Sequence, residues 1–177
     1  AAIIGSDNET IAKVCEEVNG FCAPANYNSP QQTVIAGESA AIDEAVAKFA
    51  EMGKRAVKLA VSAAFHTKLM AGAAEKFKGE IAGFPFKAPN CDFYSNLYGR
   101  KLDDFSDMPS YLAAHICSPV KFVDELTAMQ SAGIEAYVEL GPGKVLTGGV
   151  KKFDRGANAM HIENAETLEK ALAALKG

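Results

Sequence analysis

The sequence predicts an α/β protein, and two patterns carry that prediction. In the first sixty residues, a short apolar strand, a glycine and an amphipathic helix follow one another twice. After residue 62, longer helices alternate with single strands, which is the rhythm of a parallel sheet covered by helices. A chain of 177 residues with 49% hydrophobic side chains can form one sizeable core or two small ones.

The first part of the chain is predicted to follow the order β-α-β-β-α-β. A strand at 2–4 precedes a helical stripe from Ile11 to Val18, and a strand at 33–37 precedes a second stripe that ends at Phe49. Residues 22–30 lie between these units, and Gly53 should end the second helix before a β-rich segment at 55–61. This order is the split βαβ arrangement of ferredoxin-like domains, so we expect a small subdomain over residues 1–61.

Residues 62–177 are expected to belong to a larger parallel layer. We predict helices from near His66, from about Pro109, after Ser118, after Lys144 and from Asn164, with strands at 91–95 and 134–140. The helix near His66 should bury Leu69, Met70, Ala73 and Phe77, and the helix after Ser118 should use Ser118 as its N-cap and Pro119 as its first residue.

Charge and cysteine usage exclude several functional classes. The formal charge is −4, and lysine and arginine cluster only in pairs, so nucleic-acid binding is not expected. No apolar run approaches the roughly 20 residues of a membrane span, and the first residues lack the pattern of a signal peptide. The four cysteines, at 15, 22, 91 and 117, have neither metal-ligand nor disulfide-scaffold spacing, which favours reduced thiols in a cytoplasmic protein without a metal site.

His66 is the candidate catalytic residue. It lies where a predicted strand gives way to a helix, and a helix N-terminus favours the neutral imidazole that can accept a proton. Its nucleophile is missing, because the chain has no G-x-S-x-G turn and Ser62, Ser95 and Ser118 have ordinary structural positions. Cys117 is two residues from His115, a spacing that turns the two side chains to different sides of a helix.

Two further groups of residues have plainer interpretations. Gly141, Gly143 and Lys144 lack the spacing of a Walker loop and predict a tight strand-to-helix turn, with an anion site as the weaker alternative. The acidic residues Asp103, Asp104 and Asp107 are better explained by the start of a helix than by a metal site.

Four blocks of sequence carry a family resemblance: 26–37, 54–56 leading into 61–70, 118–122 and 139–148. In residues, order and spacing they resemble the malonyl-CoA:acyl carrier protein transacylases, the acyltransferases of fatty acid and polyketide synthesis. The resemblance covers essentially the whole chain. It implies the ferredoxin-like subdomain above, followed by the C-terminal part of an α/β-hydrolase-like acyltransferase subdomain over residues 62–177.

The resemblance also implies a reaction and a set of roles. An active-site serine takes malonyl from coenzyme A and passes it to the phosphopantetheine thiol of acyl carrier protein, with no bound cofactor. His66 would be the general base, and His115 falls where the family usually has a glutamine whose main-chain carbonyl accepts the histidine N–H. Ala64 and Phe65 match a malonyl-selective x-A-F-H pattern, in which the Phe65 ring would crowd an α-methyl branch.

The resemblance gives roles to three further residues, while several of the family's catalytic motifs are missing from this sequence. Asn28 would line the substrate cleft, and Lys54 and Arg55 would dock the acidic carrier protein. The family's oxyanion turn, nucleophile elbow and carboxylate-binding arginine have no counterpart in these 177 residues. We therefore expect a fragment that is inactive alone, whose partners are malonyl-CoA, the carrier protein and the missing N-terminal half, supplied as a separate chain.

Two alternatives stay open on the sequence alone. The chain could derive from an acyltransferase domain of a polyketide or polyunsaturated fatty acid synthase. It could instead be a binding module that recognises carrier protein through Lys54 and Arg55 without chemistry. The fragment interpretation further predicts an uncovered apolar sheet edge near the helix at His66.

Overall fold

The computed structural model describes residues 1–176, which divide into two compact units, Ala1–Glu125 and Leu126–Gly177. The division falls within a helix and differs from the expected boundary between residues 61 and 62, which remains a prediction about subdomains. No helix in the described part of the chain is both long and apolar enough to cross a membrane.

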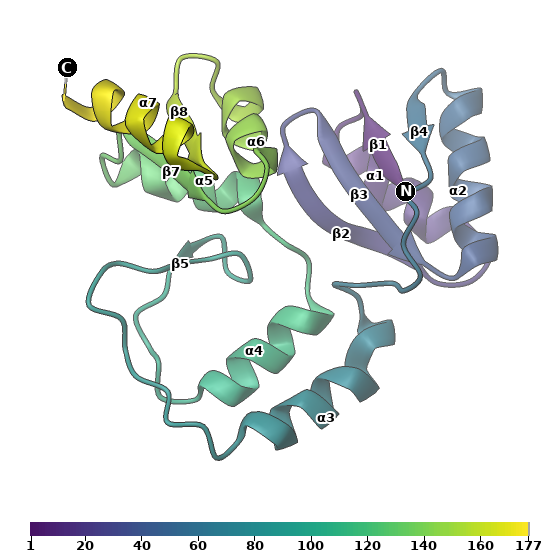
Figure 1. Cartoon of the computed structure of the whole chain (residues 1–177). Coiled ribbons are helices and arrows are strands. Elements are labelled where there is room, and N and C mark those ends of the chain that lie inside the picture. The colour runs from purple at the N-terminus through teal and green to yellow at the C-terminus, as the bar shows by residue number, and fades with distance from the viewer. Residues whose placement is uncertain (177) are drawn as a thin grey trace. The chain divides into compact units, whose positions relative to one another are not determined.

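The first unit begins with a four-stranded antiparallel sheet and two helices (Figure 1). Its strands are ordered β2-β3-β1-β4, with β1 in the middle paired to both β3 and β4. This is the βαββαβ topology that the sequence predicts. Its elements are β1 (Ala2–Ile4), α1 (Asn8–Glu17), β2 (Cys22–Ser29), β3 (Gln32–Gly37), α2 (Ser39–Glu51) and β4 (Arg55–Val57).

The core of this subdomain lies between the sheet and its two helices. Ile3 and Ile35 from the sheet, Ile11 from α1 and Phe49 from α2 are fully buried and belong to one apolar cluster. The helical spacing of apolar residues therefore faces the sheet as predicted. Truncating Phe49 to alanine would cost about 3–5 kcal/mol, because the surrounding side chains could refill the space only in part.

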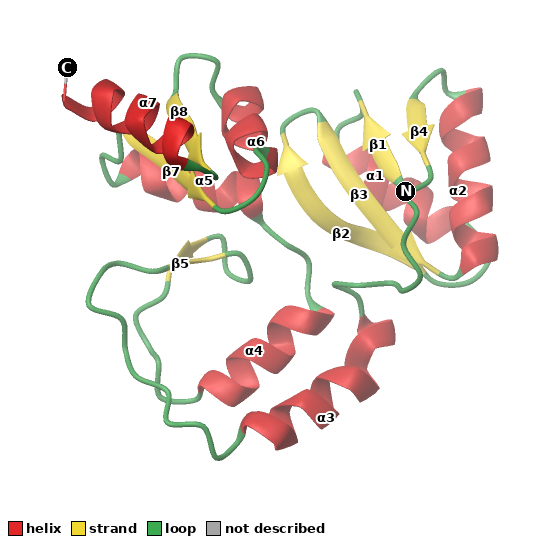
Figure 2. Cartoon of the chain, in the orientation of Figure 1, coloured by secondary structure: helices red, strands yellow, loops and turns green. Residues whose placement is uncertain are grey.

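The first unit continues with helices and a short hairpin in place of further long strands (Figure 2). A 3₁₀ turn at Lys68–Met70 runs into α3, and α3 packs against α4. The remaining elements are α3 (Ala71–Ile81), β5 (Tyr94–Ser95), β6 (Arg100–Lys101) and α4 (Met108–Cys117), and α5 (Phe122–Ser131) is the helix that crosses the division after Glu125.

Several expectations for this region are wrong. The strand predicted at 55–61 ends at Val57, and the one predicted at 91–95 shrinks to two residues that pair with β6. Along α3 only Ala74 is buried, whereas Leu69 and Phe77 are exposed, because α4 covers one narrow face of that helix.

Ser118 and Pro119 do not start a helix. Ser118 ends α4 in extended backbone, and the next residues join the open edge of β2. The N–H of Val120 donates to the carbonyl of Ala25 over 2.8 Å, and the N–H of Tyr27 donates to the carbonyl of Val120 over 2.9 Å. These backbone hydrogen bonds satisfy groups that would otherwise be orphaned at a sheet edge, which outweighs the local helix-start signal.

The second unit holds two parallel strands with helices. Strand β7 (Ala136–Leu140) pairs in parallel with β8 (Asn158–Ile162) over five residues, from Ala136 opposite Asn158 to Leu140 opposite Ile162. Helices α6 (Val145–Phe153) and α7 (Ala165–Lys176) pack on them. The parallel pairing agrees with the predicted layer, although β8 itself is absent from the sequence prediction.

Candidate active site

His66 lies in the ten-residue loop 58–67 between β4 and the 3₁₀ turn, and its backbone is held in an unusual conformation. Its φ is 61°, in the left-handed region, and it is the one non-glycine residue with positive φ in the described residues 1–176. Left-handed backbone costs free energy in a residue with a Cβ and persists where surrounding contacts impose it, often at functional sites. Thr67, the next residue, caps the helix start through its hydroxyl.

Two carbonyls at the C-terminal end of α4 hold His66. The backbone N–H of His66 donates to the carbonyl of Ile116 over 3.1 Å. The ring Nδ1 lies 3.2 Å from the carbonyl oxygen of His115. Because a carbonyl can only accept, this contact requires the proton on Nδ1, which leaves the lone pair on Nε2. The geometry therefore prepares His66 to take a proton at Nε2.

The end of α4 is itself fixed on the sheet through Val120. The residues after Cys117 hydrogen-bond to β2 at Ala25 and Tyr27, as described above. On β2 the pairing register to β3 shifts twice, between Pro24 and Asn26 and between Tyr27 and Ser29. Because β2 is an edge strand of this sheet, its outer side is open to pair with Val120.

Asn28 lies at the second of these register shifts. It falls between Tyr27 and Ser29, the two neighbours that pair with β3, and its side chain is half-buried. β-Bulges re-aim side chains and are frequent beside active sites. This position supports the expected role of Asn28 at the substrate site, which stays a prediction.

The His115 ring packs against two aromatic neighbours. It stacks on Tyr111 with ring centroids 6.3 Å apart and a 13° interplanar angle, and its centroid lies 5.8 Å from that of His66. Burial, followed by the charge of protonated His66, lowers the pKa of His115. His115 therefore stays neutral at pH 7 and places no second cation beside the base.

Tyr111 and Ser95 support this stack, a contribution that sequence reasoning missed. The hydroxyls of Ser95 and Tyr111 are 2.8 Å apart, both residues are buried, and the Ser95 hydroxyl also accepts the N–H of Tyr98. The buried face of the helix beginning near Pro109 was the available signal for Tyr111. Ser95 thus has the structural role that the sequence predicts for it.

The nucleophile remains absent near His66. Ser62 is exposed, Ser118 ends α4, and in residues 1–176 no serine or cysteine side chain is hydrogen-bonded to the His66 ring. In the described residues, the His66 ring thus has a hydrogen-bond partner at Nδ1 and no serine or cysteine partner at Nε2.

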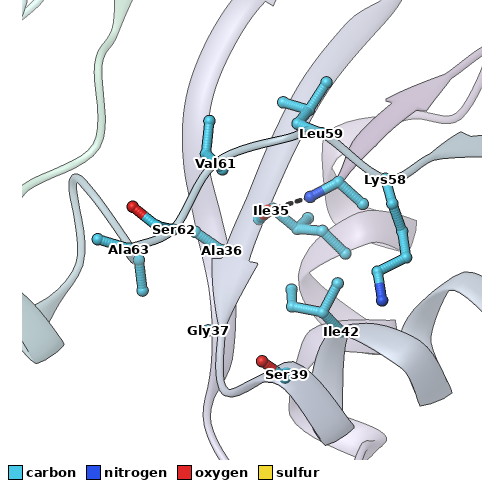
Figure 3. A pocket seen from close by; sticks show the side chains of 12 residues that line it. Ile35, Ala36, Gly37, Ser39, Ile42, Lys58, Leu59, Val61, Ser62 and Ala63 are labelled. Carbon is cyan, nitrogen blue, oxygen red and sulfur yellow. Dashed lines mark hydrogen bonds between the residues drawn. The ribbon is translucent and has the colours of Figure 1, made fainter.

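The loop that leads to His66 also closes a small cavity (Figure 3). A space of about 160 Å³ lies among Ile35, Gly37 and Ile42 on one side and the loop residues from Lys58 to Ala64 on the other. Ala64 lines this cavity, while Phe65 is 49% exposed beside it in sequence. The two residues expected to contact substrate therefore face different surroundings.

Lys54 and Arg55 lie at the opposite edge of the sheet from Asn28. They precede and begin β4, whereas Asn28 belongs to β2, three strands away and so about 14 Å across the sheet. The ammonium of Lys54 donates to the carbonyl of Gly5 over 2.8 Å, while Arg55 is exposed. Both expected docking residues are thus charged, and Arg55 is the more exposed of the two.

The alternative anion site at the glycine turn is already filled by carboxylates of the chain. The N–H groups of Leu146 and Thr147 donate to Glu139, and the N–H of Gly143 donates to Glu163 over 2.9 Å. Hydrogen bonds from Thr147 lower the pKa of Glu139, so it is ionised at pH 7. The turn interpretation is confirmed, and the anion-site alternative is wrong.

The acidic loop has the structural role expected of it. Asp107 caps α4 by accepting the N–H of Ser110 over 3.1 Å, and Asp104 accepts the N–H of Ser106 over 2.9 Å. Both carboxylates thus complete backbone hydrogen bonding at a helix start.

Apolar side chains are exposed around the His66 loop, among them Leu69 and Phe77, which the sequence analysis expected to be buried. Val57, Val61, Phe65, Leu69 and Phe77 are between 36% and 62% exposed. Val57 lies on the edge strand β4, whereas the others lie on the loop and the following helix, so the uncovered surface extends well beyond the expected sheet edge.

Comparisons with known proteins place these features in a family. The sequence model of the acyl transferase domain family matches residues 6–172 of this chain. The malonyl CoA-acyl carrier protein transacylase of Bacillus subtilis is 34% identical over 180 residues, which cover 99% of this chain and 57% of that protein. The curated relatives are thus substantially longer than this chain, which spans little more than half of their length.

Solved structures give the same result. The malonyl CoA-acyl carrier protein transacylase of Clostridium perfringens superimposes with a TM-score of 0.95 at 33% identity, over 99% of this chain and 56% of that one. A malonyl-transacylase in complex with a holo type II PKS acyl-carrier protein matches with a TM-score of 0.91 at 32% identity, over 97% of this chain and 57% of that one.

Proposed function

The chain belongs to the acyl transferase domain family, and from this membership we propose that it supplies the histidine base of a malonyl-CoA:acyl carrier protein transacylase of fatty acid synthesis. The observation that carries the proposal is the His66 ring, whose Nδ1 faces the His115 carbonyl and whose Nε2 is left to accept a proton. The names of the relatives and of the solved structures support malonyl as the acyl group.

In the proposed reaction His66 accepts one proton and then returns it, once in each of the two half-reactions. Nε2 takes the proton of a serine hydroxyl as its oxygen attacks the thioester carbonyl of malonyl-CoA, and returns that proton to the departing thiolate of coenzyme A. The phosphopantetheine thiol of the carrier protein then gives its proton to Nε2 and attacks the malonyl-serine ester. The serine oxygen leaves and recovers the proton.

The serine must come from polypeptide outside these 177 residues. The chain contains no nucleophile elbow, and no hydroxyl is bonded to His66 in the described residues. Exposed apolar side chains in both units, such as Val61 in the first and Leu140 and Val145 in the second, give such polypeptide apolar surface to cover. We infer that this chain alone does not transfer malonyl.

The remaining assignments follow from position. Phe65 directly precedes His66, and its ring would disfavour an α-methyl branch, which supports malonyl over methylmalonyl. Asn28 is assigned to the substrate site, and Arg55 with Lys54 to the docking of acidic carrier protein. The solved complex of a carrier protein with its malonyl-transacylase supports that partner. Free thiols at all four cysteines support a cytoplasmic location.

A complementation assay tests this proposal. The chain, the part of the Bacillus subtilis relative that it does not cover, and the two together are given malonyl-CoA and holo carrier protein. Malonyl-carrier protein is detected by mass. We expect product only when both polypeptides are present. Product from this chain alone would contradict the missing nucleophile, and absence of product from a co-purified pair would contradict the proposed function.

A further inference from the structure

Two buried thiols lie side by side where α1 faces β2. Cys15 is on the inner face of α1, Cys22 is the first residue of β2, and their side chains are 4% and 8% exposed. Their Sγ atoms are 3.4 Å apart, in hydrogen-bond contact, and neither sulfur is in a disulfide. Both thiols belong to the core cluster of the βαββαβ subdomain.

The sulfur atoms of the pair are already close to bonding distance. A disulfide has an S–S distance near 2.05 Å, so the sulfur atoms would need to approach by about 1.4 Å. Gly20 has a positive φ of 96° in the turn between the two elements, which brings the end of α1 back over the start of β2. Cys22 is anchored by its pairing with Gly37 of β3, so the link would tie α1 to the sheet.

We propose that Cys15 and Cys22 are an oxidation site, at which a small peroxide converts the thiol pair to an intramolecular disulfide. The Cys22 sulfur attacks one peroxide oxygen, the O–O bond breaks, and a sulfenic acid and one water form. The Cys15 sulfur then attacks the sulfenic sulfur, the S–O bond breaks, and the second water leaves. Two thiols and one hydrogen peroxide thus give one disulfide and two waters.

The order of attack follows from the contact between the thiols. Either thiol can donate to the other across this contact. Donation from Cys15 lowers the pKa of Cys22, whereas the same contact and burial raise the pKa of Cys15. Cys22 is therefore the first thiolate to form, and Cys15 is the resolving thiol.

The other two cysteines provide an internal contrast. Cys91 is exposed and Cys117 is half-buried, and neither has a neighbouring thiol in the part of the chain that the structure describes. Peroxide can add oxygen to such thiols, whereas the Cys15–Cys22 pair loses two hydrogens, about 2 Da. Mass therefore separates the two kinds of product.

Peptide mapping after peroxide treatment tests the proposal. The reduced chain and its Cys91→Ser, Cys117→Ser variant are treated with hydrogen peroxide at pH 7, and free thiols are then alkylated in denaturant. Trypsin would leave both cysteines in one peptide, because no lysine or arginine lies between them, so a glutamate-specific protease is used to cut after Glu16 or Glu17. We expect a linked peptide pair that dithiothreitol separates.

A matched variant provides the control. Cys22→Ala in the same background should give no linked pair and leave Cys15 open to alkylation, with circular dichroism confirming the fold. The proposal would be overturned if Cys15 and Cys22 of the unmutated chain were both alkylated after treatment, or if both gained oxygen without linking. Neither of those outcomes requires a core variant to fold.

Discussion

The proton on the His66 ring is located by a backbone carbonyl and by no acidic side chain. An aspartate in this position would stabilise the imidazolium by its charge, whereas the His115 carbonyl orients the ring with a dipole alone. Any side chain can stand at position 115 for this purpose, provided that the end of α4 keeps its conformation. The orientation of the His66 ring thus depends on the backbone conformation at the end of α4 and not on the side chain at position 115.

The tautomer of His66 is directly measurable. We expect ¹⁵N chemical shifts of the ring to show a protonated Nδ1 and an unprotonated Nε2 at pH 8, because Nδ1 faces a carbonyl. His161, whose Nε2 lies 3.7 Å from Glu163, serves as the reference ring in the same spectrum. A proton on Nε2 of His66 would show that the His115 carbonyl does not hold the ring.

Because of His115, the free energy of unfolding should decrease as the pH falls below neutrality. Burial lowers its folded-state pKa below the ordinary 6.5, so the unfolded chain binds the proton first as pH falls. The free energy of unfolding should therefore decrease below about pH 6.5 and keep decreasing until the folded-state pKa is reached. His115→Gln removes this dependence and keeps the main-chain carbonyl.

Urea unfolding of the wild type and His115→Gln between pH 5 and pH 8 measures the effect. The stability difference should favour the variant increasingly toward pH 5. Parallel curves for the two proteins would mean that His115 keeps its ordinary pKa.

Among single residues, the sequence pointed to His66 because it lies before a helix. The family resemblance predicted that the main-chain carbonyl of His115 would accept the N–H of the His66 ring. The sequence predicted a helix at Tyr111 and a structural role for Ser95, but not the hydrogen bond between their hydroxyls, because that contact depends on packing between α4 and a hairpin whose second strand is Arg100–Lys101. Two charged residues carry no strand pattern.

The segment that follows α4, residues 118–121, connects the β2 edge of the sheet to the helix end that holds His66. Val120 exchanges two hydrogen bonds with the edge of β2, and five residues earlier His115 presents its carbonyl to His66. The helix-start signal of Ser118 and Pro119 misled the sequence prediction here, since the edge of β2 is a partner that lies ninety residues away in the chain. The βαββαβ order, in contrast, follows from local periodicity and was predictable.

Replacing Val120 with proline should loosen this connection. Val120→Pro removes the N–H that donates to Ala25, so the free energy of unfolding should fall by about 1–3 kcal/mol. The His66 ring shifts should also change, because the α4 terminus would lose its anchor. Pro119→Ala, which leaves both hydrogen bonds of Val120 in place, is the matched control.

Urea unfolding and the ¹⁵N spectrum give the two readouts for Val120→Pro. Equal midpoints for the two variants, with unchanged His66 shifts, would show that the β2 edge contributes nothing to the site.

The chain as a whole combines a complete βαββαβ subdomain with exposed large apolar side chains in both units. Leu140 is 77% exposed and Val145 83% exposed in the second unit, and the His66 loop exposes several apolar side chains in the first. Family membership, the match to a little over half of the relatives' length and the absent nucleophile elbow are the observations behind the proposal that this chain supplies a base and other polypeptide supplies the nucleophile. Strand β8 escaped prediction, because its five residues include an exposed asparagine and a histidine.

The most direct test of the account measures malonyl transfer by the complemented enzyme with and without His66. His66→Ala should lower kcat/KM by about 10²- to 10⁴-fold, because the serine and then the carrier thiol lose their proton acceptor. His161→Ala, a histidine substitution in the second unit, should leave the rate unchanged. Transfer at the wild-type rate by a folded His66→Ala enzyme would contradict the claim that this chain supplies the catalytic base.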